Sequence, residues 1–337
     1  MSGIYSGRRW AVILILLSIS LWGCGPTSFL LTPVSGQREL RESRIHRDAG
    51  LWVVDKIAVI EVDGLMVNKS SRSLFEEGEN PVSLFLEKLE RARKDEEVKA
   101  VVLRLNSPGG TVGASDLMYH ALRDFRKTTG KPVVACMLDV AASGAYYLAC
   151  GCDGIMAQPT SITGSIGIIF QTVSFAGTMD KLGITAEAIK SGDLKDMASP
   201  LRPLGDQERQ ILQKLVMHFY ENFLEVVLAG RAGLTREKLQ GWADGRVFTA
   251  EQAKEAGLID KIGYPLEAVA WAKQLAGVEK ARVVIYHRPL GYKPNIYASA
   301  GTNVEAGALV NIEIPEWLRA EGPQFLYLWQ VGDLSAR

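Results

Sequence analysis

An unbroken apolar run from Pro132 to Leu138 lies between a Gly-Lys turn and Asp139. Such a run is typical of a strand buried on both faces, as in parallel sheets that helices cover on both sides. Residues 140–144, Val-Ala-Ala-Ser-Gly, then lead into a short apolar stretch that predicts a helix. The chain therefore places Ser143 at a strand-to-helix turn of an α/β fold.

Strands and helices alternate on both sides of this turn. Strands are predicted at 56–63, 98–105, 154–158 and 281–287, and helices at 82–94, 114–127, 205–230, 249–256 and 265–276. This alternation calls for a parallel sheet with right-handed crossovers, in which sites gather at the carboxyl ends of strands. Because the loops at 106–113 and 139–144 both follow strands, we expect them to lie side by side.

Composition narrows the classes of function. The 337 residues are 47% hydrophobic, and 38 basic residues balance 38 acidic ones. This balance, without a basic run interleaved with aromatics, leaves no electrostatic footprint for nucleic acid. The four cysteines lack the spacing of zinc ligands. Cys150 and Cys152 are too close in sequence for an unstrained disulfide, so we interpret them as small buried thiols.

The N-terminus predicts export. Arg8 and Arg9 precede an uncharged stretch, residues 10–22, which as a helix rises only about 20 Å and is short of a hydrocarbon core of roughly 30 Å. A secretory signal is therefore favoured over a permanent span. Residues 21–24, Leu-Trp-Gly-Cys, resemble a bacterial lipoprotein box in which Cys24 is lipidated, and an uncleaved membrane helix is the alternative. Either anchor puts the body on the extracytoplasmic, periplasmic side of a membrane.

Four parts follow from these features. They are a signal peptide with a lipoprotein box (1–24), a tether (25–54), a globular domain (55–290) and a C-terminal extension (291–337). The tether mixes Gly, Pro, Thr and Ser with a charged run at 38–44 that we interpret as partly helical. The extension ends in Phe-Leu-Tyr-Leu-Trp at 325–329, a segment apolar enough to be buried on its own domain or at a subunit interface.

Hydrolysis by a serine requires a base. The four histidines are His46, His120, His218 and His287, and none has a recognisable Ser-His-Asp context. A lysine can replace histidine where burial keeps it neutral, which requires a large downward pKa shift. Lys190 and Lys195 are candidates, against the common role of a lysine as a solvated charge. Ser143, taken alone, is more readily interpreted as a helix N-cap, and the other motifs of the chain are what favour a catalytic role.

Adjacent glycines follow the strand at 98–105, in Ser107-Pro108-Gly109-Gly110. Glycines let backbone N–H groups face a substrate oxygen, as an oxyanion hole requires. A generic strand-to-helix turn is the alternative. A phosphate loop is excluded because no Gly-Lys-Ser/Thr follows.

Five motifs occur in a fixed order. They are Asn106–Gly110, Ala142–Tyr147, Thr163–Gly167, Lys190-Ser191-Gly192 with Lys195-Asp196, and Asp244–Phe248. In combination, over about 57–286, the chain resembles the signal peptide peptidase A family of Ser-Lys peptidases. The resemblance implies a Clp-protease/crotonase-like α/β fold: a mostly parallel sheet with flanking helices, in a single compact domain per chain.

The resemblance also implies roles for particular residues. Ser143 would be the nucleophile, Lys195 the general base, and Ser165 the residue that hydrogen-bonds and orients the lysine. The oxyanion hole would consist of the backbone N–H groups of Gly110 and Gly144. Family members assemble into rings or domes in which the serine and the lysine can come from neighbouring subunits. The resemblance calls for no metal and no cofactor.

We therefore interpret the chain as a membrane-associated serine endopeptidase that degrades remnant signal peptides or other short apolar peptides through an acyl-enzyme. A homo-oligomeric ring is the expected assembly. One alternative is a catalytically silent homologue of the fold that acts as a membrane-associated assembly protein. Another is a crotonase-type acyl-CoA enzyme, against which export argues because acyl-CoA is cytosolic. For the 291–337 extension, a further hypothesis is that the tail occupies the substrate groove.

Overall fold

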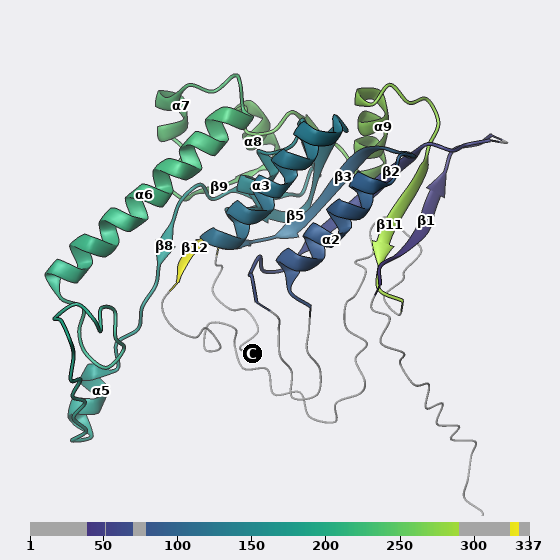
Figure 1. Ribbon diagram of the computed structural model, residues 1–337. Coiled ribbons are helices and arrows are strands. Elements are labelled where there is room, and N and C mark those ends of the chain that lie inside the picture. Colours follow the sequence, from purple (N-terminus) through teal and green to yellow (C-terminus); the bar gives the residue numbers. More distant parts are fainter. Residues whose placement is uncertain (1–38, 51, 70–78, 290–323, 330–337) are drawn as a thin grey trace, which may run out of the picture. The chain divides into compact units, whose positions relative to one another are not determined.

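The computed structural model describes residues 39–50, 52–69, 79–289 and 324–329 (Figure 1). The predicted signal peptide, Cys24 and most of the C-terminal extension lie outside these residues. Within them, no helix combines the length and the apolar character that crossing a membrane requires.

A mostly parallel sheet forms the centre of the fold, in the order β1-β11-β2-β3-β5-β6-β10. Its strands are β1 (Arg41–Arg47), β11 (Arg282–His287), β2 (Lys56–Asp63), β3 (Val98–Ser107), β5 (Val133–Ala142), β6 (Gly154–Ala157) and β10 (Lys261–Ile262). Neighbours along this order pair in parallel, except that β1 is antiparallel to β11. Short strand β7 (Ile162–Gly164) continues beside the end of β5, and β9 (Val247–Thr249) pairs with β7.

Helices cover both faces of this sheet, as the apolar strands predict. Alternate residues of β2 point to opposite faces: Ile60 packs in the core under α2 (Pro81–Lys94) and α3 (Val112–Thr129), and Val59 packs under α9 (Pro265–Leu275). The remaining helices are α4 (Gly144–Ala149), α5 (Ala176–Lys181), α6 (Asp206–Gly230), α7 (Arg236–Gln240) and α8 (Ala250–Glu255).

A second, three-stranded sheet stands beside the first. Its order is β4-β12-β8, formed by β4 (Gly109–Thr111), β12 (Phe325–Leu328) and β8 (Ile169–Phe170), and both pairings are antiparallel. In Figure 1, β12 is the short yellow arrow beside β8. The expectation that 325–329 is buried is confirmed for Tyr327, which is only 1% exposed.

Part of the predicted tether belongs to the sheet instead. Arg41–Arg47 is an edge strand and not a helix, and all six of its partners lie in β11. The Ser43 hydroxyl and the His287 ring nitrogen Nε2 lie 2.8 Å apart across this pair. The side chains of β1 are half-buried or exposed, so this strand is held by backbone pairing. It carries no apolar pattern from which the sequence could predict a strand.

Candidate active site

Ser143 occupies a strained position between β5 and α4. Its backbone has φ 53° and ψ −114°, a conformation that non-glycine residues rarely adopt. Bonds on both sides hold it there: the Ser143 N–H donates to the Gly164 carbonyl at 2.8 Å, and the Ser143 carbonyl accepts from the Tyr147 N–H at 2.9 Å. Strain of this kind persists only where the surrounding structure enforces it, and it concentrates at functional sites.

The side chain of Ser143 is not a helix cap. Its Oγ makes no capping hydrogen bond to α4, although the residue stands at the N-cap position. Ser143 is 1% exposed, and its Oγ has no hydrogen-bond partner among the residues that the structure describes. The capping interpretation is therefore wrong, and Ser143 Oγ is an exception to the rule that a buried hydroxyl finds a partner.

The two glycine-bearing loops lie side by side, as the sequence predicts. Ser107 pairs with Ala141, and the Val140 N–H donates to Asn106 Oδ1 at 3.2 Å. Ser165 directly follows β7 and lies at the same edge of the sheet, because β7 runs parallel to the last residues of β5.

Ser165 resembles Ser143 in its backbone. Its φ is 50°, its N–H donates to the Arg246 carbonyl at 2.8 Å, and its side chain is buried. The preceding residue, Gly164, accepts the Ser143 N–H. Two strained serines therefore lie on adjacent strand ends, one of them the proposed nucleophile.

The backbone of β4 directs one N–H toward the site. On one edge, Met66 donates to the Gly109 carbonyl and accepts from the Thr111 N–H, both at 2.9 Å. Because successive N–H groups of a strand alternate between its edges, the Gly110 N–H points the other way. Glycine is required at 110, since a Cβ there would lie 1.9 Å from the Met66 carbonyl oxygen.

The Gly110 and Gly144 backbones approach each other closely. A Cβ built on Gly144 would lie 3.2 Å from the Gly110 nitrogen, and one built on Gly109 would lie 2.7 Å from the Gly144 nitrogen. Gly109 itself has φ 103°, which favours glycine. The structure thus brings together the two N–H groups that the sequence predicts for an oxyanion hole.

Lys195 is not brought to Ser143 within this chain. Its side chain is exposed, and Ser143 Oγ has no partner in the described part of the chain. Lys195 lines an open surface pocket together with Ser191, Asp193 and Gln207. The predicted base therefore lies in a separate part of the subunit from the predicted nucleophile.

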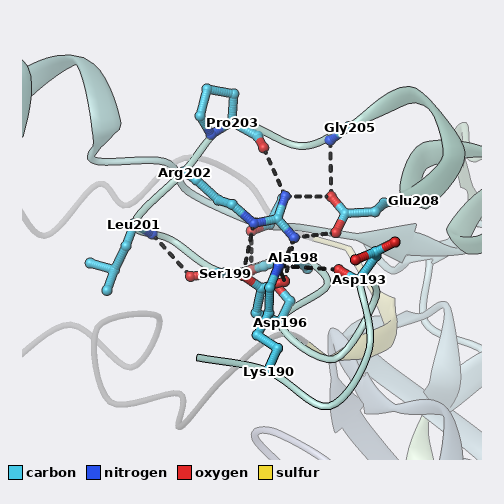
Figure 2. A network of polar contacts seen from close by, with 11 residues as sticks. Lys190, Asp193, Asp196, Ala198, Ser199, Leu201, Arg202, Pro203, Gly205 and Glu208 are labelled. Atoms are coloured by element: carbon cyan, nitrogen blue, oxygen red, sulfur yellow. Dashed lines mark hydrogen bonds and ion pairs between the residues drawn. The ribbon is translucent and has the colours of Figure 1, made fainter. Parts of the chain in front are cut away.

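An ion-pair network holds the loop that carries Lys195 (Figure 2). Asp196 accepts from Lys190 Nζ at 2.8 Å and from Arg202 at 2.7 Å, and Arg202 also pairs with Glu208 in the first turn of α6. Hydrogen bonds from Arg202 and then from Lys190 hold the pKa of Asp196 well below its usual range. Lys190 thus braces the loop, and Arg202 and Glu208 are supporting residues that the sequence did not reveal.

Other candidate groups do not contribute to this site. Cys136, Cys150 and Cys152 are buried free thiols, and burial raises the pKa of Cys150 to about 12. The interpretation of Cys150 and Cys152 as buried thiols is confirmed. In the described ranges, no group of three or more His, Cys, Asp or Glu side chains is placed to hold a metal ion.

The mostly parallel sheet with flanking helices defines a Clp-protease/crotonase-like fold. At one strand end it carries a strained serine beside two converging glycine N–H groups. Residues 125–279 match the sequence pattern of peptidase family S49. The chain is 34% identical to a signal peptide peptidase SppA of Enterococcus faecium over 251 residues, 74% of this chain and 72% of the relative.

Other relatives agree. A protease of Synechocystis is 37% identical over 228 residues, 68% of this chain and 77% of the relative. The chloroplastic serine protease SPPA of Arabidopsis thaliana is 33% identical over 255 residues, 74% of this chain and 37% of that longer protein. The chain therefore belongs to the signal peptide peptidase A family of S49 peptidases, and it is a peptidase.

Proposed function

We propose that this peptidase is a serine endopeptidase with Ser143 as nucleophile and Lys195 as general base. The observation that carries the proposal is the buried Ser143 Oγ, held in a strained turn without a hydrogen-bond partner among the described residues. The next residue, Gly144, approaches Gly110 closely, and the two backbone N–H groups would stabilise negative charge on a substrate oxygen there.

The chemistry follows from these groups. A neutral lysine takes the proton of the Ser143 hydroxyl, and the resulting alkoxide attacks a peptide carbonyl. The Gly110 and Gly144 N–H groups stabilise the oxyanion, the lysine returns the proton to the leaving amine, and water hydrolyses the acyl-enzyme. Ser165, on the adjacent strand end, is suited to orient the lysine.

The base comes from a neighbouring subunit in this proposal. Lys195 is exposed, and the segment around it presents apolar side chains to the surface, as interfaces do. Those at least 38% exposed are Ile169, Val173, Phe175, Leu182, Ile184, Ile189, Leu201, Leu215 and Met217. Packing this segment on a second copy in a homo-oligomeric ring would cover it. Burial at such an interface favours the neutral form of a lysine, which catalysis needs.

Remnant signal peptides and other short apolar peptides are the proposed substrates. The name of the Enterococcus faecium relative supports this class. The sequence of the N-terminus supports attachment to the extracytoplasmic side of a membrane, through lipidated Cys24 or through a helix at 10–22.

Peptidase assays on the full chain in detergent test the dyad. Wild type, Ser143→Ala and Lys195→Ala are compared on a fluorogenic apolar peptide across pH 6 to 10. We expect both variants to lose activity by about 10⁴-fold or more, whereas Lys127→Ala, at an exposed lysine in the last turn of α3, retains it. The acidic limb of the wild-type profile then reports the apparent pKa of the base. Full activity of folded Lys195→Ala would overturn the assignment of the base.

A further inference from the structure

The motif at Asp244–Phe248, to which the proposed chemistry assigns no role, lies against the motif at Thr163–Gly167. β9 pairs antiparallel with β7, and the pairing continues past the end of β7, where the Ser165 N–H donates to the Arg246 carbonyl at 2.8 Å. The Asp244–Phe248 motif therefore belongs to the immediate surroundings of Ser165, the residue that is suited to orient the lysine.

Glycines in both motifs allow this close approach. A Cβ built on Gly164 would lie 2.6 Å from Phe248 Cδ2, and one built on Gly167 would lie 3.3 Å from Gly245 Cα. The N–H of Gly245, whose φ of 91° favours glycine, donates to the Ile166 carbonyl at 3.1 Å. The glycines of the two motifs are thus explained by the packing of one backbone against the other.

The Asp244 carboxylate sets the conformation of the turn before β9. Its Oδ1 accepts the Arg246 N–H at 3.1 Å, two residues along the chain, which is the Asx-turn hydrogen bond that aspartate and asparagine form. The Arg246 side chain donates to both carboxylate oxygens, from Nε at 2.8 Å and from Nη2 at 2.6 Å. Hydrogen bonds from this side chain and then from the Arg246 N–H lower the pKa of Asp244 to about 2. The carboxylate is therefore charged across pH 6 to 10.

The two ends of this turn are fixed by other elements. Before it, the Tyr220 hydroxyl of α6 donates to the Ala243 carbonyl at 2.8 Å. After it, β9 pairs with β7. Between these two anchors, the Asp244 carboxylate holds Arg246, whose carbonyl accepts the Ser165 N–H.

Ser165 depends on its surroundings for its conformation. A non-glycine residue with a φ of 50° is strained, and such strain persists only where neighbouring groups enforce it. The Arg246 carbonyl holds Ser165 from the side of β9, and on the side of β5 the preceding Gly164 carbonyl accepts the Ser143 N–H. A change in the 244–246 turn would consequently move the Ser165 side chain.

We propose that Asp244 is a positioning residue that orients the Ser165 hydroxyl toward the proposed base Lys195, an inference that rests on the proposed function of these residues. Asp244 acts through the backbone: its carboxylate shapes the turn, and the turn presents the Arg246 carbonyl to the Ser165 N–H. It takes no part in proton transfer, because its charge is constant across the pH range in which the lysine acts.

Substitutions at Asp244 separate the turn hydrogen bond from the ion pair. Asp244→Asn keeps an oxygen that can accept the Arg246 N–H, whereas Asp244→Ala loses it. In the full chain in detergent, with the fluorogenic apolar peptide, we expect Asp244→Ala to lower kcat by about tenfold with a nearly unchanged KM. The acidic limb of its pH profile should move upward, because a displaced hydroxyl no longer favours the neutral amine.

The asparagine variant is the matched control, and its kcat should stay within about threefold of the wild-type value. Wild-type kcat and an unmoved acidic limb in Asp244→Ala would overturn the inference. So would an asparagine variant as impaired as the alanine variant, because the ion pair and not the turn would then be responsible.

Gly245→Ala disturbs the same turn without removing a polar group. A Cβ at 245 meets nothing within 4 Å, so the substitution acts only through the backbone, whose φ is 91°. We expect the acidic limb to move upward, as in Asp244→Ala. The control is Gly130→Ala, another glycine with positive φ whose Cβ meets nothing within 4 Å. An unmoved acidic limb in folded Gly245→Ala would overturn the inference.

A double-mutant cycle tests whether Asp244 acts through Ser165. In a chain that already carries Ser165→Ala, the added Asp244→Ala should lower kcat by no more than about twofold, because the hydroxyl that it positions is absent. Effects of the two substitutions that multiply would show that Asp244 acts by another route and would overturn the inference.

Amide hydrogen exchange separates this inference from the proposed function. If Ser165→Ala leaves kcat and the pH profile unchanged, the proposed role of Ser165 fails. The link from Asp244 to Ser165 is then judged by exchange of the Ser165 amide. Exchange about tenfold faster in Asp244→Ala than in wild type and in Asp244→Asn supports the link, and equal exchange in the three chains overturns it.

Discussion

Ser143 and Lys195 lie in surroundings that differ in burial and in the contacts that hold them. Ser143 is 1% exposed, and backbone hydrogen bonds to Gly164 and Tyr147 hold it at the end of a central strand. Lys195 is exposed on a loop that side-chain ion pairs hold at the start of α6. The proposed nucleophile is thus positioned by backbone hydrogen bonds of the fold, whereas the proposed base lies on a loop that charged side chains hold.

This difference indicates where the active site can be completed. A buried serine and its glycine N–H groups are preformed in one chain, and only the group that takes the proton is missing from the described surroundings of Ser143 Oγ. Residues 169–217, which include this loop, carry most of the large apolar side chains that are exposed in the described part of the chain. Assembly into a ring would therefore both bring a lysine to Ser143 and cover these apolar side chains.

Among the residues that support Ser143 and Lys195, Gly110 is expected to show the largest effect. A Cβ at this position would lie 1.9 Å from the Met66 carbonyl oxygen, so Gly110→Ala must displace the oxyanion donor. We expect kcat to fall by about 10²- to 10³-fold. The control is Gly113→Ala, because a Cβ at that position meets nothing within 4 Å. Similar kinetics for the two folded variants would contradict the role of the Gly110 N–H.

A smaller effect is expected at Ser165, which we propose orients Lys195 of the neighbouring subunit. Ser165→Ala should lower kcat by about 10- to 100-fold and move the acidic limb of the pH profile upward. The upward shift follows because a hydroxyl that donates to a neutral amine favours the deprotonated lysine. Exposed Ser83→Ala, in α2, is the control. A fall in kcat with an unmoved pH profile would indicate a purely structural role for Ser165.

The smallest effect is expected on the lysine side, at Arg202. Arg202→Ala removes the link between Asp196 and Glu208, and we expect activity to fall by no more than about tenfold, through looser placement of the loop. Thermal stability should fall only slightly, because Arg202 is one-third exposed and the buried Glu208 carboxylate keeps the Gly205 N–H as a partner. Arg209→Ala, at an exposed position in the first turns of α6, is the control. If Arg202→Ala instead lowered the melting temperature markedly, the loss of activity would reflect a less stable fold and not a misplaced loop.

The pH dependence of this network has a defined sign. Since the folded-state pKa of Asp196 is depressed below its ordinary value of 3.8, its ion pairs are fully present above that value and are lost only as the pH falls further. Across pH 6 to 10 the Asp196 charge is therefore constant. The activity ratio of Arg202→Ala to wild type should accordingly be flat over this range, and a ratio that varies with pH would implicate another group.

Local pattern predicted much of the fold and part of the site. The helix expected at 82–94 is Pro81–Lys94, and the strand expected at 98–105 is Val98–Ser107, because amphipathic spacing and continuous apolar runs are strong local signals. The proximity of the Gly110 and Gly144 loops followed from the rule that parallel strands end at one edge.

Other features depend on contacts that no local pattern encodes. The polar strand β1 exists through its pairing with β11, and β12 through its pairing with β4 and β8. The positive φ of Ser143 is enforced by tertiary hydrogen bonds. Arg202 and Glu208 pair across an irregular turn at a spacing that matches no helical or strand period.

The central claim is that Ser143 and Lys195 act from different subunits, and mixing two inactive variants tests it most directly. Ser143→Ala and Lys195→Ala chains are unfolded together, refolded together and assayed, with each variant alone as control. If the residues pair between subunits of a ring, random mixing should restore about a quarter of the wild-type activity. No recovery in demonstrably mixed assemblies would contradict the account and would place the base within the same chain or on another residue.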